Sequence, residues 1–277
     1  MSQNVAAWFQ QVWNSEVKLA YQQTEAKLRN TVRVKTNIKG ETTHFPRADT
    51  MEVGDKERGG LVPVSNPDMD KVSCSLAAKY GGAYVDDLDE IQHNSDERGV
   101  HVKNAAGAHG RNTDKIIITA LMTAATNVVG DYTAGFSQSL AQSAIEILNN
   151  SHVPDDGDRF ALLTPHAWEE LYKIQAFAHA DWVGDKDLPW MGGSQAKRWR
   201  NILWMQHTGL TINGAQATNI IYHKTAAGHA IGRDLKTEWS WENTRSAWFL
   251  NTNMFQGACL IDAKGVVQIR TKNDTVL

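Results

Sequence analysis

Residues 31–84 read TVRVKTNIKGETTHFPRADTMEVGDKERGGLVPVSNPDMDKVSCSLAAKYGGAY, and this stretch decides the fold. Its first limb, residues 31–39, alternates strictly between two kinds of side chain. One face carries Val32, Val34, Thr36 and Ile38, and the other carries charged or amide side chains. A period of two residues predicts a strand with one face buried.

The return limb, residues 71–80, alternates in the same way, so the two limbs predict a ribbon of two strands. Between them, residues 40–70 are rich in Gly, Pro, Asp, Glu and Thr and poor in large apolar side chains. This composition predicts a long polar tip without regular structure. A two-stranded ribbon is only marginally stable alone in water, and a long irregular span is usually functional. We therefore expect a neighbouring chain to order this arm.

The composition bounds the class of protein. A chain of 277 residues can bury a full core, in one large domain or in two intertwined ones. With 42% hydrophobic and 21% charged residues, it has the composition of a soluble globular protein. The formal net charge of −3 argues against a dedicated nucleic-acid-binding protein, which would usually carry a basic excess. A protein that lies beside nucleic acid without gripping it stays possible.

The two cysteines, Cys74 and Cys259, are far apart in the sequence, each in a strand-like run. This arrangement favours buried free thiols in a reducing cytosol over a disulfide framework or a metal site. The N-terminal residues show no secretory signal, and no apolar run approaches the roughly 20 residues that span a bilayer. These features predict a protein that is made and folded in a cytoplasm.

Periodicity and capping residues predict several helices. We expect an amphipathic helix over residues 6–29. Residues 86–125 predict two collinear or gently broken helices, because glycines interrupt the pattern and permit close packing or a kink. Two more helices are expected over residues 137–150 and 165–177, the second with Thr164 as its N-cap and proline in its first turn.

Short apolar runs predict a set of strands beyond the ribbon. They lie at residues 160–164, 218–222, 246–250, 258–261 and 266–269. Residues 262–265 predict a hairpin turn between the last two, with glycine where a positive φ is needed. Residues 179–214 are expected to be loop-rich, with tryptophans as anchors. The resulting class is α+β, with a mixed or antiparallel sheet.

Eight of the ten tryptophans fall at or after Trp168. Tryptophan side chains bury large areas and are enriched at interfaces. A tryptophan-rich core in the C-terminal half and an interface are therefore equally open interpretations.

The ten histidines invite a metal hypothesis that their spacing does not support. The pairs His101/His109 and His223/His229 lack the i, i+4 spacing of helical ligands, and no HExxH or CxxC motif accompanies them. No nucleophile elbow, P-loop or dinucleotide-binding spacing is present either. We therefore expect no catalytic residue, no cofactor and no metal site.

Two acidic groups could still suggest chemistry. Asp181, Asp185 and Asp187 could bind a cation, but acids in a loop are more often solvated. The acids at residues 86–90 could form an acid–base site, but they also fit the first turns of a helix, where the macrodipole favours negative charge. The simpler interpretation is structural in both places.

The order of these elements resembles the major capsid protein of tailed bacteriophages, which has the Hong Kong 97-type fold. The resemblance covers nearly the whole chain. The most similar phrases are Ala180–Gly184 (ADWVG), His207–Leu210 (HTGL) and the stretch from Phe255 to Asp262. The family carries no catalytic residues, which agrees with the empty motif search.

The resemblance implies a division into an N-terminal arm, an extended β-hairpin called the E-loop, a peripheral (P) domain with a long spine helix, and an axial (A) domain. The implied segments are the arm at 1–30, the E-loop at 31–85, the P domain at 86–125 and 236–277, and the A domain at 126–235. Contacts between subunits are expected in the arm and the E-loop. The candidate contact residues are Trp8, Val32, Val34, Ile38, Phe45, Val72, Leu76 and Tyr80.

The function that the resemblance implies is self-assembly, as hexamers and pentamers, into an icosahedral head that encloses double-stranded DNA. The E-loop begins by residue 31 and leaves no room for a long scaffolding extension, so a separate scaffolding protein is expected. A portal protein is a further implied partner, a decoration protein is left open, and the DNA would be contacted non-specifically. The expected location is the virion, after assembly in the cytoplasm of a bacterial host, with no membrane partner.

Two other functions stay open. The first is the shell of an encapsulin-like nanocompartment, which shares the fold and encloses a cargo enzyme. The second is a soluble metal-dependent hydrolase that uses the His and Asp side chains near residues 179–187.

Overall fold

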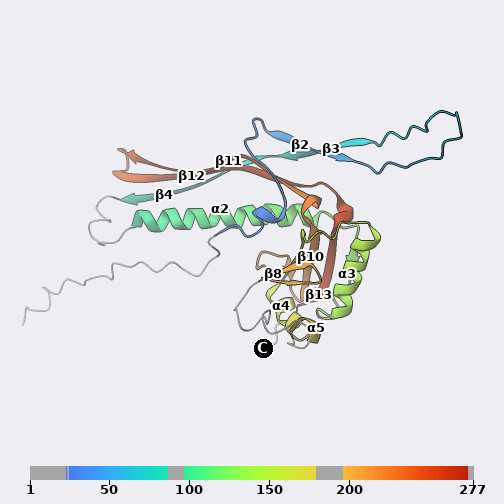
Figure 1. The fold of residues 1–277 in the computed structure, drawn as a ribbon. Coiled ribbons are helices and arrows are strands. Elements are labelled where there is room, and N and C mark those ends of the chain that lie inside the picture. The colour runs from blue at the N-terminus through green and yellow to red at the C-terminus, as the bar shows by residue number, and fades with distance from the viewer. Residues whose placement is uncertain (1–22, 24, 87–96, 179–195, 274–277) are drawn as a thin grey trace, which may run out of the picture. The chain divides into compact units, whose positions relative to one another are not determined.

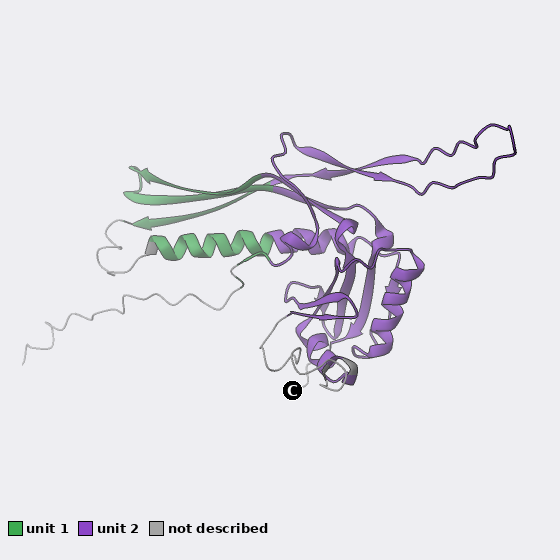
Figure 2. Cartoon of the chain, in the orientation of Figure 1, with its two compact units in different colours: residues 1–26, 78–112, 233–255 green, residues 27–77, 113–232, 256–277 purple. Residues whose placement is uncertain are grey.

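The computed structural model describes residue 23 and residues 25–86, 97–178 and 196–273 (Figure 1). The chain divides into two compact units, which Figure 2 shows in different colours. Unit 1 comprises residues 1–26, 78–112 and 233–255, and unit 2 comprises residues 27–77, 113–232 and 256–277. Each unit therefore draws on three separate stretches of the sequence.

The seven-stranded sheet lies in unit 2. Its order is β5 (Val128–Val129), β13 (Val266–Lys272), β10 (Gln216–His223), β6 (Arg159–Leu163), β8 (Ile202–Gln206) and β7 (Ala196–Trp199), with β9 (Ile212–Asn213) paired to β10. Strand β10 is antiparallel to β13 and to β6, whereas β6 and β8 are parallel. The sheet is mixed, which is one of the two forms that the sequence predicts.

Strand β6 is buried along its whole length, so both faces of this sheet are covered. Ala161 and Leu163 belong to an apolar cluster with the helices α3 (Gln138–Asn150) and α4 (Pro165–Tyr172). Phe160 and Leu162 belong to a second cluster with the C-terminal part of α2 (Glu97–Met122). Trp204 is fully buried in the first cluster, so part of the tryptophan-rich half is core.

The helix caps follow the sequence signals. The Ser137 hydroxyl accepts from Leu140 N at the start of α3, and the Thr164 hydroxyl accepts from Ala167 N at the start of α4. The predicted helix over 165–177 is divided, because α4 ends at Tyr172 and a short helix α5 (Gln175–Ala178) follows. Bonds of the i→i+3 type from Lys173 N and Ile174 N tighten the chain between them.

Unit 1 holds the N-terminal part of α2 and part of a four-stranded sheet. The four-stranded sheet has the order β1 (Arg33–Lys35), β11 (Ala227–Glu242), β12 (Ala247–Leu260) and β4 (Ala77–Asp86). In unit 1, Nε2 of His109 lies 3.1 Å from Oγ1 of Thr252. Because the Thr252 hydroxyl donates its proton to Gly81 O, His109 must donate to Thr252 from Nε2.

The prediction that the two limbs pair with each other in one ribbon is wrong. Strand β1 covers only three residues and runs parallel to β11, with Val34 opposite His229. The alternation ends at Asn37, whose φ of 58° is left-handed. The return limb pairs instead with β2 (Thr42–Ala48), inside the stretch predicted to be irregular. The ribbon is therefore a hairpin of β2 and β3 (Met69–Ser75).

The buried face of the return limb changes at Leu76. Cys74 and Leu76 are buried at even positions, but Tyr80 is exposed and Val85 is buried at an odd position. Strand β3 ends at Ser75 and β4 begins at Ala77, with Leu76 N bonded to Glu41 O between them. Since this break shifts the pleat by one residue, the continuous alternation predicted through Tyr80 is wrong.

Helix α2 is continuous from Glu97 to Met122, so the predicted break within this span is wrong. The expected close packing is present at Gly110, where a Cβ atom would lie 3.0 Å from Ala26 N. The predicted helix over residues 6–29 falls mostly outside the described residues. Its described end forms a short 3-10 turn, η2 (Arg29–Thr31).

The C-terminal strands also differ from the prediction. The runs at 246–250 and 258–261 are parts of one long strand, β12. The predicted hairpin turn at 262–265 is a 3-10 turn, η5 (Ala263–Gly265), which connects β12 and β13 in different sheets. Gly265 does not have a positive φ. A side chain is excluded at this position because a Cβ atom would lie 2.9 Å from Ala226 Cβ.

Candidate assembly interface

The β2–β3 hairpin is covered by the rest of unit 2 at its base but not at its far end. Its register places Thr42 opposite Ser75, Phe45 opposite Val72, and Ala48 opposite Met69. We call residues 42–48 and 69–76 the hairpin base and residues 49–68 the tip. Thr43, Phe45, Cys74 and Leu76 of the base are buried, whereas nearly every residue of the tip is exposed. Figure 1 shows the tip continuing beyond the paired strands as a long irregular loop.

The hairpin base is seated on glycines of unit 2. A Cβ atom at Gly228 would lie 2.8 Å from the ring of Phe45, so the ring packs directly on the backbone of β11. The guanidinium of Arg33 lies 5.8 Å from the centre of the same ring. On β12, a Cβ atom at Gly257 would lie only 2.1 Å from Ser75 O. Both contacts require residues without a side chain.

Polar contacts fix the hairpin base further. Lys35 Nζ donates to Thr43 Oγ1 at 3.0 Å and to His44 O at 3.3 Å. The Arg47 guanidinium pairs with Asp49 at 3.2 Å and with Asp262 at 3.9 Å, and these two carboxylates raise the pKa of Arg47. The charged groups are exposed or half-buried, so their contribution is orientation more than stability.

The tip combines exposed apolar side chains with an excess of acids. Val53 and Leu61 are each 96% exposed. The other exposed large apolar residues from 51 to 69 are Met51, Val62, Val64 and Met69. Residues 49–70 also carry six carboxylates and only two cationic side chains, Lys56 and Arg58. Apolar side chains this exposed indicate a surface that a partner covers.

The candidate contact residues lie in three kinds of place. Val32, Phe45 and Leu76 are buried within their own chain, so they support the hairpin from inside. Val34 and Tyr80 are exposed, and Ile38 and Val72 are half-buried. Trp8 lies outside the described residues. The apolar residues of the tip were missed because they are few and spread over a segment rich in Gly, Pro and acidic residues, which gives no strand or helix period.

The N-terminal segment enters unit 2 through a buried carboxylate. Asp114 of α2 accepts hydrogen bonds from Lys27 N at 3.1 Å and Leu28 N at 3.0 Å. The next turn is held by Thr31, whose hydroxyl bonds to Leu28 O and to the hydroxyl of Tyr222. Burial raises the pKa of Tyr222 far above its usual value, so this phenol stays protonated. These bonds fix where the chain begins β1.

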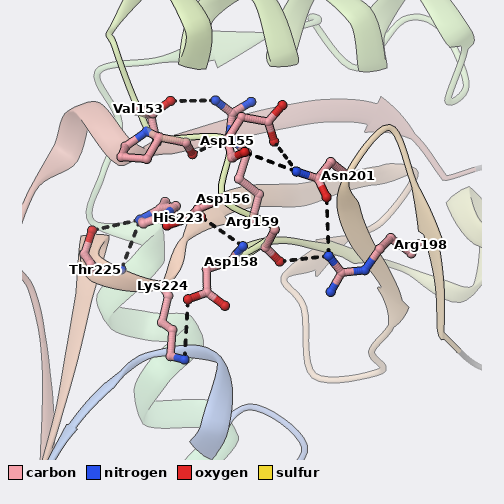
Figure 3. A network of polar contacts seen from close by, with 12 residues as sticks. Val153, Asp155, Asp156, Asp158, Arg159, Arg198, Asn201, His223, Lys224 and Thr225 are labelled. Atoms are coloured by element: carbon pink, nitrogen blue, oxygen red, sulfur yellow. Dashed lines mark hydrogen bonds and ion pairs between the residues drawn. The ribbon is translucent and has the colours of Figure 1, made fainter.

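A second polar cluster surrounds the turn between α3 and β6 (Figure 3). The buried guanidinium of Arg159 donates to Val153 O and Pro154 O. Asn201 donates to Asp155, Arg198 donates to Gly157 O, and Lys224 pairs with Asp158 at 3.6 Å.

His223 completes this cluster. Its Nε2 lies 3.1 Å from Oδ1 of Asp156, and its Nδ1 accepts from Thr225 N, so Nε2 carries the proton. Hydrogen bonds from Asp158 N and from His223 lower the pKa of Asp156. The acids of the turn are thus partnered by backbone and side chains, which makes the cluster a structural device.

Metal chemistry finds no support in the described ranges 25–86, 97–178 and 196–273. No group of three or more His, Cys, Asp or Glu side chains lies together there in a way that could hold a metal ion. His109 and His223 are each bonded within the protein, as described above. Asp181, Asp185 and Asp187 lie outside the described residues.

Two comparisons with known proteins bear on this hairpin-bearing fold. A model of the family described as phage capsid protein matches residues 5–273. The chain belongs to the phage capsid protein family. Among curated protein sequences, none matches this capsid chain.

Solved capsid structures share the fold at low sequence identity. The capsid of the cyanophage P-SCSP1u has a TM-score of 0.77 and 14% identity, covering 99% of this chain and 96% of that one. The protein of Mycobacterium phage Che8 has a TM-score of 0.72 and 17% identity, with 95% and 97% covered. The capsid of a native GTA particle has a TM-score of 0.74 and 11% identity, with 97% of each chain covered.

These likenesses confirm the α+β, Hong Kong 97-type fold that the resemblance implied. They also make this a structural capsid protein that assembles into shells. None of the described helices of the capsid protein is long and apolar enough to cross a membrane.

Proposed function

We propose that this chain is the major capsid protein of a tailed bacteriophage and forms an icosahedral head around double-stranded DNA. The building blocks are hexamers and pentamers of identical chains. The observation that carries the proposal is the tip of the β2–β3 hairpin, whose apolar side chains are exposed while the base is firmly seated. A rigid base with an uncovered tip is suited to reach a neighbouring subunit.

The energy of such a contact is modest for one hairpin. Fully burying an apolar side chain of this size contributes about 1.5–3 kcal/mol. Full burial of the six exposed apolar residues at positions 51–69 would thus contribute at most about 9–18 kcal/mol, and incomplete burial and the cost of ordering the loop reduce this to a modest net energy. Repeated around a closed shell, contacts of this size give stability without a strong pairwise affinity.

The assignment of segments follows the family resemblance. The N-terminal arm is residues 1–30, the E-loop 31–85, the P domain 86–125 and 236–277, and the A domain 126–235. Of the candidate contact residues, the exposed Val34 and Tyr80 and the half-buried Ile38 and Val72 are the ones that we assign to subunit contacts together with the tip. Trp8 of the arm stays a candidate on the same grounds.

The partners follow from assembly. A separate scaffolding protein and a portal protein would guide and close the shell, and a decoration protein is left open. A chain with a net charge of −3 suits a non-specific contact with packaged DNA, because a strongly basic wall would hold the DNA too tightly. Assembly would take place in the bacterial cytoplasm, and we assign no catalytic step to the chain.

The decisive experiment removes the tip and keeps the base. Deleting residues 40–70 would also remove β2, so the deletion should cover residues 50–67, with a short glycine linker between β2 and β3. We expect a folded chain that forms no closed shells by electron microscopy. Shells that form normally would contradict the role of the tip.

The matched control replaces Lys56 and Arg58 by Ser and keeps the length of the tip. It should assemble, because it keeps the apolar side chains of the tip.

Particles isolated from a producing cell would separate the two shell functions, the phage head and the nanocompartment. DNA inside supports a phage head, whereas a protein cargo without DNA would support the nanocompartment.

A further inference from the structure

The fold brings the two cysteines together. Cys74 lies on β3 in the hairpin base, and Cys259 lies near the end of β12, both within unit 2. The two side chains lie close enough to influence each other's titration, and Cys259 lies beside the backbone of Gly228. Both cysteines are free thiols in this structure. Their sequence separation gives no hint of this pairing.

The approach of the two backbones is independent evidence for the pairing. Gly257, two residues before Cys259, touches the residue after Cys74, because a Cβ atom at Gly257 would lie 2.1 Å from Ser75 O and 3.1 Å from Leu76 Cα. Gly228 receives the ring of Phe45 on the neighbouring strand β11. The hairpin base therefore contacts β11 and β12 closely, and the contact on β12 lies next to both cysteines in the sequence.

The two thiols differ in access and in acidity. Cys74 is 1% exposed, whereas Cys259 is only half-buried. The interaction between the two side chains lowers the pKa of Cys74, and the same interaction raises the pKa of Cys259. Once Cys259 has reacted with an external oxidant, Cys74 lies beside the mixed disulfide and is placed to resolve it.

We propose that Cys74 and Cys259 are an oxidisable pair whose disulfide fastens the base of the β2–β3 hairpin to strand β12. The oxidant is a small disulfide such as oxidised glutathione. Cys259 attacks one of its sulfurs and releases one reduced thiol, and Cys74 then attacks the Cys259 sulfur and releases the second. Two S–H bonds are lost from the protein and one S–S bond is formed, while both protons and both electrons pass to the oxidant.

The setting for this step rests on the proposed function. A capsid chain is made in a reducing cytoplasm, where both thiols stay reduced and the hairpin base is held by packing alone. A released particle has no supply of reduced glutathione. The pair would then close in the finished shell and lock the base of each hairpin after its tip has found its place.

The test uses the full-length chain, purified with a reductant that is then removed. It is incubated with oxidised glutathione, quenched in acid, denatured and labelled with a maleimide polymer, so that each free thiol adds one step in mass. We expect two labels before oxidation and none after it, with the mobility of a single chain on a non-reducing gel. Two labels after prolonged oxidation, or a disulfide-linked dimer as the main product, would overturn the proposal.

Single variants separate the roles of the two thiols. Cys74→Ser should leave Cys259 as a stable mixed disulfide with glutathione, which mass spectrometry detects. Cys259→Ser should leave Cys74 unmodified in the folded chain, because it is buried. A Cys74 that reacts as fast as Cys259 would contradict the order of steps. Should a variant not fold, the label count on the unchanged chain still decides the question.

A second measurement reports the fastening itself. Oxidation should slow amide hydrogen exchange in β2 and β3 by ten-fold or more and leave β10 and β13 unchanged. Unchanged exchange in the hairpin base would overturn the fastening even if the disulfide forms. Neither result depends on shells, whose formation is scored separately by electron microscopy, so this proposal and the assembly function can fail independently.

Discussion

Nε2 of His207 lies 3.0 Å from Oδ2 of Asp114, although the two residues are far apart in the sequence. Gly209 N donates to Nδ1 of the same ring, so His207 carries its proton on Nε2 and donates it to the carboxylate. Asp114 also accepts from the backbone at Lys27 and Leu28. One buried carboxylate thus joins α2, the chain after β8 and the start of the N-terminal segment within unit 2.

Replacing this carboxylate should cost stability. In Asp114→Asn, the amide nitrogen would face a donor, either the His207 ring or a backbone N–H. A buried polar group without its partner costs about 1–3 kcal/mol, so the free energy of unfolding should fall by that amount in urea denaturation. Asp131→Asn is the control, since Asp131 is bonded only to its own turn at Thr133 and the change should stay within about 0.5 kcal/mol. Equal stabilities would contradict the junction.

Adding one methyl group at Gly257 should weaken the contact between the hairpin base and β12. In Gly257→Ala, the new carbon would lie 2.1 Å from Ser75 O, so the strands must move apart. Overpacking of this kind costs about 1–3 kcal/mol, and hydrogen exchange in β2 and β3 should become faster. Gly60→Ala in the tip has its nearest neighbour at 3.3 Å and should leave exchange in the base unchanged. The idea fails if both variants behave alike.

The stability of the chain should fall at mildly acidic pH because of His109. Burial lowers the pKa of this histidine below its ordinary 6.5, so the unfolded state binds a proton more readily than the folded state does. The stability that neutral His109 contributes is fully present above pH 6.5, and it is lost as the pH falls from 6.5 through the lowered pKa of the folded state. His109→Gln keeps a donor for Thr252 and cannot titrate. Urea denaturation at pH 7.5 and 5.5 should show wild type losing more stability than the variant; a constant difference would refute this.

Replacing apolar residues of the tip by polar ones should block assembly without affecting the fold. Leu61 is 96% exposed and Val64 82% exposed, so Leu61→Ser with Val64→Ser should change the free energy of unfolding by less than about 0.5 kcal/mol. Each lost apolar contact between subunits removes about 1.5–3 kcal/mol, which is enough to prevent a weakly held shell. Light scattering and electron microscopy report assembly. Assembly at the wild-type rate would show that the tip is not a contact.

The sequence was most informative where signals were local. Thr164 and Pro165 mark the start of α4 because a cap and a fixed φ act within one turn. Strand β6 could be predicted because its apolar run is continuous and both of its faces are buried. The exposed tip of the β2–β3 hairpin could be predicted for a similar reason, since its composition excludes a core of its own.

Other elements depended on contacts that no short pattern carries. Strand β2 was missed because Pro46 interrupts it, yet a proline is tolerated where a strand has a neighbour on one side only. Strands β7 and β8 were missed because their tight turn is made by Arg200 and Asn201, with φ values of 50° and 61°, instead of glycine. The seat of the hairpin on Gly228 and Gly257 joins segments that only tertiary folding brings together.

The charge of the hairpin tip limits the shape of any assembly. Five carboxylates against two cations make two tips repel each other, so a symmetric pairing of tip with tip is disfavoured. The apolar side chains must therefore be covered by a surface unlike the tip, which is a heterologous contact. A contact of this kind does not stop at a dimer; it continues from copy to copy until the ring or shell closes on itself.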